Sequence, residues 1–275
     1  PPAAGQQIEV APGIHWLRMP LPFQLNHINL WLLRDGDGWT IVDTGFANDA
    51  VRDIWRPLIA GLDGPVHRLI VTHFHPDHLG LATWLMEETG AQLWMTSGEF
   101  LTAHVVWNEV GGHGARFMVE QFRQHGLEAE RLAKFEKRGS GYRMAVPALP
   151  EHYHRLKAGD TVAVDGKKWR ILIGHGHSPE HMALYCAELG VLISGDMLLP
   201  KISTNISVFA ATPEADSLGW FLESLQELAG EMPEKTLVLP SHGLPFTGIQ
   251  ARVEALRAHH EDRLRALEET CEDAP

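Results

Sequence analysis

The residues best suited to chemistry lie in one short segment, Thr72 to His78, which reads Thr-His-Phe-His-Pro-Asp-His. Three histidines and one aspartate occupy its last six positions, directly after an apolar run that predicts a buried strand. Imidazole nitrogen and carboxylate oxygen suit zinc, iron or manganese. In a tight turn, His73 and His75 can point to one side while Asp77 and His78 reach a second position. The segment therefore predicts a metal site, against the alternative of a chance cluster of surface histidines.

Further motifs with histidine or aspartate follow strand-like runs elsewhere in the chain. In chain order they are Val42-Asp43-Thr44-Gly45, Gly176-His177-Ser178-Pro179, Ser194-Gly195-Asp196 and Pro240-Ser241-His242-Gly243. Together with the His-x-His-x-Asp-His segment, they resemble the motifs of the metallo-β-lactamase superfamily and occur in the family's order. The match extends over most of the chain. Asp196 matches the family's aspartate that bridges two metal ions. Its presence makes the chain resemble the glyoxalase II and lactonase-like branch more than the true β-lactamases.

The resemblance implies a role for each matching residue. His73, His75 and His177 would bind a first divalent ion, and Asp77, His78 and His242 a second, with Asp196 bridging both. Asp77 and Asp196 are the implied catalytic residues, because Asp77 would orient a metal-bridging hydroxide and perform its proton transfer. Asp43 would support the ligand loop, although a simple turn or capping aspartate is the alternative. Zinc is the expected metal, and iron or manganese also suit these ligands.

One assignment has a competing residue. His175 and His177 lie two positions apart, and the family places its ligand directly before Ser/Thr-Pro, which favours His177. His175 is then a neighbour of the site or a plain surface residue.

The elements around these motifs predict an α/β fold, and the resemblance implies a four-layer αββα sandwich. Strands are expected in these regions: 7–18 as a pair, 29–33, 39–42, 69–72, 92–95, 161–164, 169–173, 182–186, 191–194 and 237–239. Helical spacing begins at Val51, where Pro57 is expected to kink or shorten the helix. Another helix is expected to begin with Thr212 as its cap and Pro213 in its first turn. We expect one domain over residues 1–275.

Residues 97 to about 157 predict a helical insertion in that domain. Thr96 and Glu99 resemble a capping box at its start, and apolar and aromatic residues recur along it at helical spacing. Two interpretations stay open. The insertion could be a lid that favours a substrate with an apolar acyl part, or an ordinary packed helical hairpin or homodimer contact.

The composition of the chain restricts the classes of partner and the cellular location that we expect. The net charge of −12 and the lack of a basic run disfavour nucleic acid. No apolar run is long enough to span a bilayer, and no signal-peptide pattern is present, so no membrane partner is expected. Two cysteines are too few for a disulfide framework and favour a reducing, cytoplasmic location.

We therefore expect a metal-dependent hydrolase acting on a small molecule with an ester-type bond, either a thioester or a lactone. A phosphodiesterase or nuclease of the same fold is the alternative, and a β-lactamase-like side activity is compatible with it. A non-hydrolytic metal redox or sensor protein would need redox-active iron, and no flavodoxin-like segment accompanies the chain.

Overall fold

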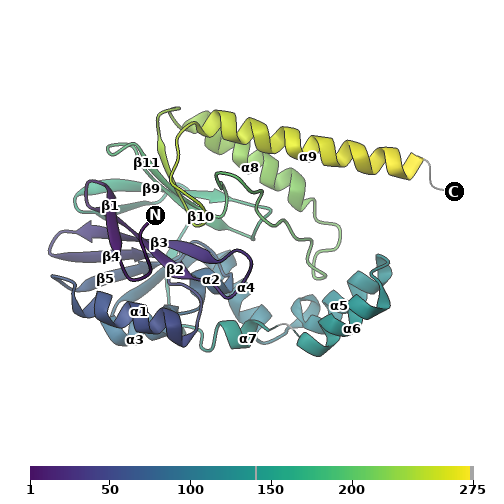
Figure 1. The fold of residues 1–275 in the computed structure, drawn as a ribbon, viewed down its shortest axis with the longest axis horizontal. Coiled ribbons are helices and arrows are strands. Elements are labelled where there is room, and N and C mark those ends of the chain that lie inside the picture. Colours follow the sequence, from purple (N-terminus) through teal and green to yellow (C-terminus); the bar gives the residue numbers. More distant parts are fainter. Residues whose placement is uncertain (140, 273–275) are drawn as a thin grey trace.

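Two β-sheets packed face to face form the centre of the computed structural model, which describes residues 1–139 and 141–272 (Figure 1). The first sheet has the order β1 (Gln7–Ala11), β2 (Ile14–Pro20), β3 (His27–Asp35), β4 (Gly38–Val42), β5 (Val66–Ile70), β6 (Gln92–Thr96) and β7 (His154–Leu156). The second has the order β12 (Leu237–Pro240), β11 (Val191–Gly195), β10 (His181–Cys186), β9 (Lys167–Gly174) and β8 (Thr161–Val164). Neighbouring strands are parallel from β4 to β7 and between β11 and β12, and antiparallel elsewhere.

Apolar side chains from the facing sides of the two sheets fill the space between them. Trp31 of β3 and Trp169 of β9 are almost completely buried and belong to one apolar cluster that draws on both sheets. Because side chains alternate sides along a strand, the other face of each sheet must also be covered. Helices supply that cover.

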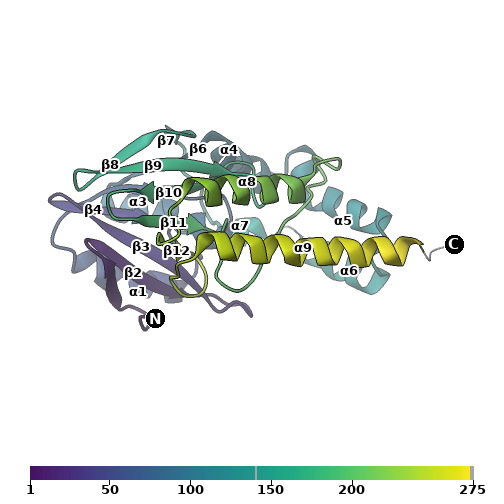
Figure 2. The same ribbon diagram turned by 90° about the horizontal axis from the view of Figure 1, so that it is seen from above.

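The outer layers come from two helix pairs. Helices α1 (Asp49–Ala60) and α3 (Ala82–Thr89) pack on the first sheet, where Trp55 and Leu85 are buried. Helices α8 (Ser217–Glu231) and α9 (Ile249–Glu272) pack on the second, where Phe221 and Leu256 are buried. Figures 1 and 2 show the two pairs on opposite sides of the sheets. The four-layer αββα sandwich expected from the motifs is confirmed.

Further helices lie in the segment expected to be an insertion. They are α4 (Ser97–Trp107), the short 3-10 helix η1 (Gly111–His113), α5 (Ala115–Gln124), α6 (Ala129–Arg138) and α7 (Tyr142–Ala145), while α2 (Pro76–Leu79) lies within the histidine-rich loop. The segment is not wholly helical, because β7 near its end pairs with β6. In both views, α5 and α6 project from the body on the same side as the far end of α9 (Figures 1 and 2).

One local expectation is wrong, and the structure adds detail to another. Helix α8 begins after Asp216, whose Oδ1 accepts a hydrogen bond from the Gly219 N–H at 2.9 Å, so Asp216 caps it instead of Thr212. Helix α1 runs three residues beyond Pro57 to Ala60, so the proline does not end it. Burial of the apolar face of α1 against the sheet outweighs the backbone hydrogen bond that a proline cannot make.

Neither a membrane-spanning helix nor a disulfide occurs in residues 1–139 and 141–272. No helix in these ranges combines the length and the apolar character that crossing a bilayer requires. Cys186, buried in β10, and Cys271, exposed near the end of α9, are both free thiols.

Candidate metal centre

The candidate site lies where strand ends from both sheets meet. In the first sheet, Asp43 follows β4 and the histidine-rich loop follows β5, and these two strands are parallel. In the second sheet, β9, β11 and β12 run in one direction and lead to His177, Asp196 and His242. The seven side chains expected to bind metal are therefore brought together, although they span 170 positions of the chain.

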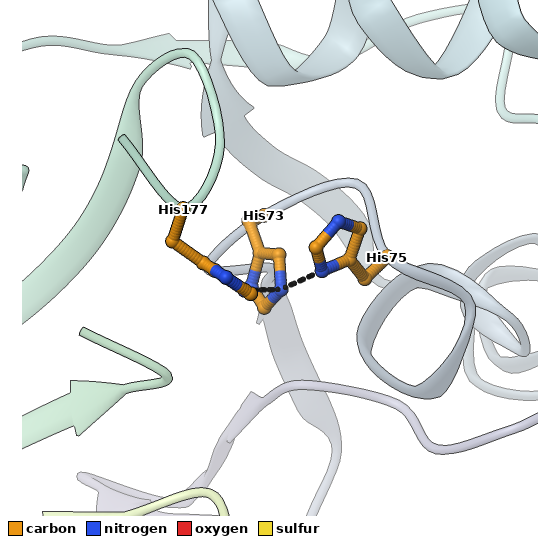
Figure 3. Close-up of side chains that lie close together, drawn as sticks. All are labelled: His73, His75 and His177. Carbon is orange, nitrogen blue, oxygen red and sulfur yellow. Dashed lines mark hydrogen bonds between the residues drawn. The ribbon is translucent and has the colours of Figure 1, made fainter. Parts of the chain in front are cut away.

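Three histidines form the first group of the site (Figure 3). The Nε2 atom of His73 lies 2.9 Å from Nδ1 of His75 and 3.1 Å from Nε2 of His177. Zinc with nitrogen ligands at its usual bond length in a tetrahedron holds those nitrogens about 3.3 Å apart. The observed spacing is close to that value.

The protonation of these rings also suits a cation. Nδ1 of His177 donates to the carbonyl oxygen of Asn205 at 2.6 Å, which leaves Nε2 of the neutral ring with a free lone pair. Burial lowers the pKa of His177, and burial lowers the pKa of His75 to about 3. The pKa of His73 lies well below its usual value for the same reason. Three neutral imidazoles whose nitrogens converge can share one cation.

The second group combines histidines with a carboxylate. Nε2 of His242 lies 3.4 Å from Oδ2 of Asp77, and Nε2 of His78 lies 3.8 Å from the same oxygen. Burial disfavours positive charge on His242, but Asp196 and Asp77 outweigh it and raise the pKa of His242 to about 10. Burial likewise opposes charge on His78, and Asp43, Asp77 and Asp196 together raise its pKa well above the usual value. This half of the site attracts positive charge.

Asp196 lies between the two groups. Its Oδ2 is 3.5 Å from Nε2 of His177, in the first group, and its Oδ1 is 3.3 Å from Nε2 of His242, in the second. Each carboxylate oxygen thus faces a different group, so Asp196 would be able to contact an ion in either one.

Buried polar atoms without partners test whether a metal fits. Within residues 1–139 and 141–272, Nε2 of His78 and Oδ1 of Asp196 have no hydrogen-bond partner, and they lie 3.7 Å apart. An unsatisfied buried polar atom is costly, and a divalent cation between these atoms would satisfy both. The residues present fit divalent metal ions.

Asp43 supports the histidine-rich loop in the way its motif suggests. Its Oδ1 accepts from the backbone N–H of Thr72 at 2.8 Å, and its Oδ2 accepts from Nδ1 of His78 at 2.8 Å. The second bond turns Nε2 of His78 toward the site. Asp43 has a φ of 61°, a left-handed conformation that aspartate tolerates better than most residues.

His175 turns away from the other histidines. Its Nδ1 donates to the carbonyl oxygen of Pro179 at 2.7 Å on the exposed side of the loop. His177 is the one of the pair whose ring reaches the first group.

His27 and Asn29 position His242, and sequence patterns did not predict this role for either residue. Nδ1 of His242 donates to the carbonyl oxygen of His27 at 2.8 Å, which directs Nε2 toward Asp77 and Asp196. The side chain of Asn29, completely buried, donates to the carbonyl oxygens of Pro240 and Gly243. Strand β3 therefore holds both sides of the turn that carries His242.

Glu99 was expected in a capping box, and that expectation is wrong. The side chain of Thr96 donates to the carbonyl oxygen of Glu180 at 3.0 Å, so it does not cap α4. The Glu99 carboxylate accepts from the backbone N–H of Phe74 at 3.0 Å and from the Ser178 hydroxyl at 2.6 Å. Both partners are adjacent to histidines of the first group, a relation that local sequence patterns do not contain.

The match to known families covers this whole arrangement. The family model described as the metallo-beta-lactamase superfamily matches residues 24–242, a range that includes all of the motifs. The chain belongs to this superfamily. Members of this superfamily similar to the chain are metallo-hydrolases, and the chain is a metal-dependent hydrolase.

Individual relatives support this assignment over most of the chain. A beta-lactamase domain protein from Burkholderia ambifaria is 47% identical, with a TM-score of 0.87, and the alignment covers 98% of this chain and 80% of that one. The probable metallo-hydrolase YqjP of Bacillus subtilis (strain 168) is 26% identical over 92% of this chain and 80% of its own length. A hydroxyacylglutathione hydrolase of Synechococcus sp. (strain JA-3-3Ab) is 35% identical over a shorter stretch, 34% of each chain.

Proposed function

We propose that this metallo-hydrolase holds two divalent ions and cleaves an ester-type bond, in a thioester or a lactone. His73, His75 and His177 would hold one ion and Asp77, His78 and His242 the other, with Asp196 between them. The observation that carries the proposal is the placement of Asp196, whose two oxygens face the two groups. Zinc is the proposed metal, and iron or manganese suit the same donors.

The side chains around the ions would perform distinct tasks. When bound, two such ions supply a water with a lowered pKa and an electrophilic partner for the substrate oxygen. Asp77 is the more exposed of the two site carboxylates, with its side chain 20% exposed. Its Oδ2 faces His242 and His78, so its other oxygen would be the one to accept a proton from the attacking water. His78 and His242 keep their Nε2 atoms directed inward because Asp43 and the His27 carbonyl hold their Nδ1 protons.

The ester-type substrate is supported by chemistry and by similarity. A bridging aspartate is the feature that resembled thioesterases and lactonases in the sequence, and one relative is named as a hydroxyacylglutathione hydrolase. Val208 and Leu244 are 42% and 51% exposed. Val208 lies three residues after Asn205, whose carbonyl oxygen accepts from His177, and Leu244 lies two residues after His242. These apolar side chains suit a substrate with an apolar acyl part. The small-molecule partner, the cytoplasmic location and a homodimer remain predictions.

A substrate panel on protein of known metal content tests the proposal. Zinc-loaded protein should hydrolyse thioesters or lactones with a kcat/KM well above that for bis-(p-nitrophenyl) phosphate and a chromogenic cephalosporin. His177→Ala should lower kcat/KM at least about 100-fold, because a ligand is lost. His175→Ala is the matched control and should stay within about threefold, because its ring points away from the site.

Three results would count against the proposal. Turnover of the phosphodiester alone would favour the phosphodiesterase alternative. Equal losses of metal in the two histidine variants would show that the assignment of His177 is wrong. Redox-active iron spectra without hydrolysis of any substrate would favour the redox or sensor alternative.

A further inference from the structure

Glu99 is a buried carboxylate outside the set of residues proposed to bind metal. It lies in the first turn of α4, and none of its surface is exposed. The candidate metal-binding groups found in residues 1–139 and 141–272 do not include it. A buried carboxylate is costly unless strong hydrogen bonds compensate, so its contacts should reveal its use.

Three donors surround the Glu99 carboxylate. Oε2 accepts from the backbone N–H of Phe74 at 3.0 Å. Oε1 accepts from the Ser178 hydroxyl at 2.6 Å and from the backbone N–H of Glu180 at 2.7 Å. Backbone N–H groups can only donate, so both oxygens must accept, and a carboxylate is the side chain that offers this.

These donors belong to two loops that are far apart in the chain. Phe74 lies between His73 and His75, and Ser178 directly follows His177. One carboxylate therefore joins the turns that carry all three histidines of the first group. Phe74 has a second partner as well, because the Tyr142 hydroxyl donates to its carbonyl oxygen at 2.6 Å. Both backbone polar groups of Phe74 are held by side chains from the 97–157 segment.

The three hydrogen bonds favour the ionised form of Glu99, and burial opposes it more strongly. Burial raises the pKa of Glu99 to about 7, against the hydrogen bonds from Ser178, Glu180 and Phe74 that lower it. The position in the first turn of α4 also favours negative charge, because unpaired N–H groups collect at that end of a helix.

We propose that Glu99 is a positioning residue of the metal centre. It keeps the His73–His75 turn and the His177 turn at the separation that lets their three ring nitrogens converge. The proposal rests on the proposed function, since it assumes that these histidines hold an ion. Glu99 acts through Phe74, Ser178 and Glu180 and does not touch the reacting atoms.

Metal titration of the full chain tests this role. In Glu99→Gln, one oxygen becomes an NH2 group that faces a donor, so at least one loop loses its hydrogen bond. The dissociation constant of one zinc ion, measured by competition with a chromophoric chelator, should rise about 10- to 100-fold, while the other ion is bound with little change. Amide hydrogen exchange at Phe74 or Glu180 should become faster in the metal-free variant. The exchange rate measures the loss of the hydrogen bond to residue 99 without any assay of activity.

Two further variants keep the test decisive if Glu99→Gln folds poorly. Ser178→Ala and Tyr142→Phe each remove one hydroxyl and should each weaken binding of the same ion by about 2- to 10-fold. Asp49→Asn is the control for losing a carboxylate at a helix N-terminus. Asp49 lies in the first turn of α1, where it pairs with Arg52 at the surface, so zinc binding should change less than about threefold.

The possible failures are distinguishable. If the wild-type chain binds two ions and Glu99→Gln, Ser178→Ala and Tyr142→Phe bind both equally well, the positioning role is wrong and the proposed function stands. If Asp49→Asn weakens binding as much as Glu99→Gln, the effect comes from the loss of negative charge in general, and the positioning role is again wrong. If the wild-type chain binds no ion, both proposals are wrong.

Discussion

The 97–157 segment contains two regions that differ sharply in their contacts. The inner part, α4 and α7, packs into an apolar cluster beneath the histidine-rich loop, where Ala103 and Tyr142 are buried against Phe74. The outer hairpin, α5 and α6, packs mainly on itself. The ring centroids of Phe122 and Phe135 lie 5.1 Å apart within the hairpin, and its remaining surface is largely exposed.

This difference divides one insertion into two roles. The inner part holds both backbone groups of Phe74, so we assign it to the support of the candidate metal centre. The outer hairpin projects from the body (Figures 1 and 2) and is the part to which the lid and dimer-contact interpretations still apply. Treating residues 97–157 as one unit, as the sequence suggested, would mix these roles.

A matched pair of phenylalanine substitutions should give the largest contrast between the two regions. Phe74→Ala removes a buried ring that packs between His75 and Tyr142, and it should lower the free energy of unfolding by about 3–5 kcal/mol. Phe135→Ala removes a partly exposed ring from the outer hairpin and should cost about 1 kcal/mol or less. Urea denaturation of metal-free protein measures both, and equal losses would contradict the division.

Deleting the outer hairpin should have a smaller effect on the site. Replacing residues 115–138 with a short Gly-Ser linker should leave two zinc ions per chain and shift the melting temperature by only a few degrees, because the hairpin adds little to the main core. If the hairpin is a lid, kcat/KM for long acyl substrates should fall relative to short ones. Loss of zinc or of folding would show that the hairpin supports the core after all.

The smallest effect is expected at the ion pair within that hairpin. Nη2 of Arg123 in α5 lies 2.8 Å from Oε1 of Glu136 in α6, and both side chains are about half exposed. Exposed pairs of this kind contribute about 1 kcal/mol or less. Arg123→Ala should therefore leave zinc binding unchanged and shift thermal unfolding only slightly, whereas reduced zinc binding would connect the hairpin to the metal centre.

The sequence predicted the layers and the groups of histidines because both depend on local signals. Alternating apolar residues marked strands such as β9 and β10, and the spacing of His73, His75 and Asp77 marked the loop. The sequence did not predict that Asp216, and not Thr212, caps α8, since both types cap helices and packing selects between them.

Long-range contacts account for most of what the sequence did not predict. Glu99 lies 25 positions from Phe74 and 79 from Ser178, so its local pattern with Thr96 suggested a cap. Asn29 lies 211 positions from Pro240, and nothing near it in the chain signals that contact. Burial of a polar side chain became informative only when the fold showed which donors and acceptors meet it.

Zinc-edge anomalous diffraction from crystals of the zinc-loaded chain, with metal content measured on the same sample, tests the central claim most directly. The account predicts two ions per chain. One should lie among His73, His75 and His177, the other among Asp77, His78 and His242, with one oxygen of Asp196 directed at each. A chain that takes up no zinc, or peaks that lie away from Asp196, would contradict it.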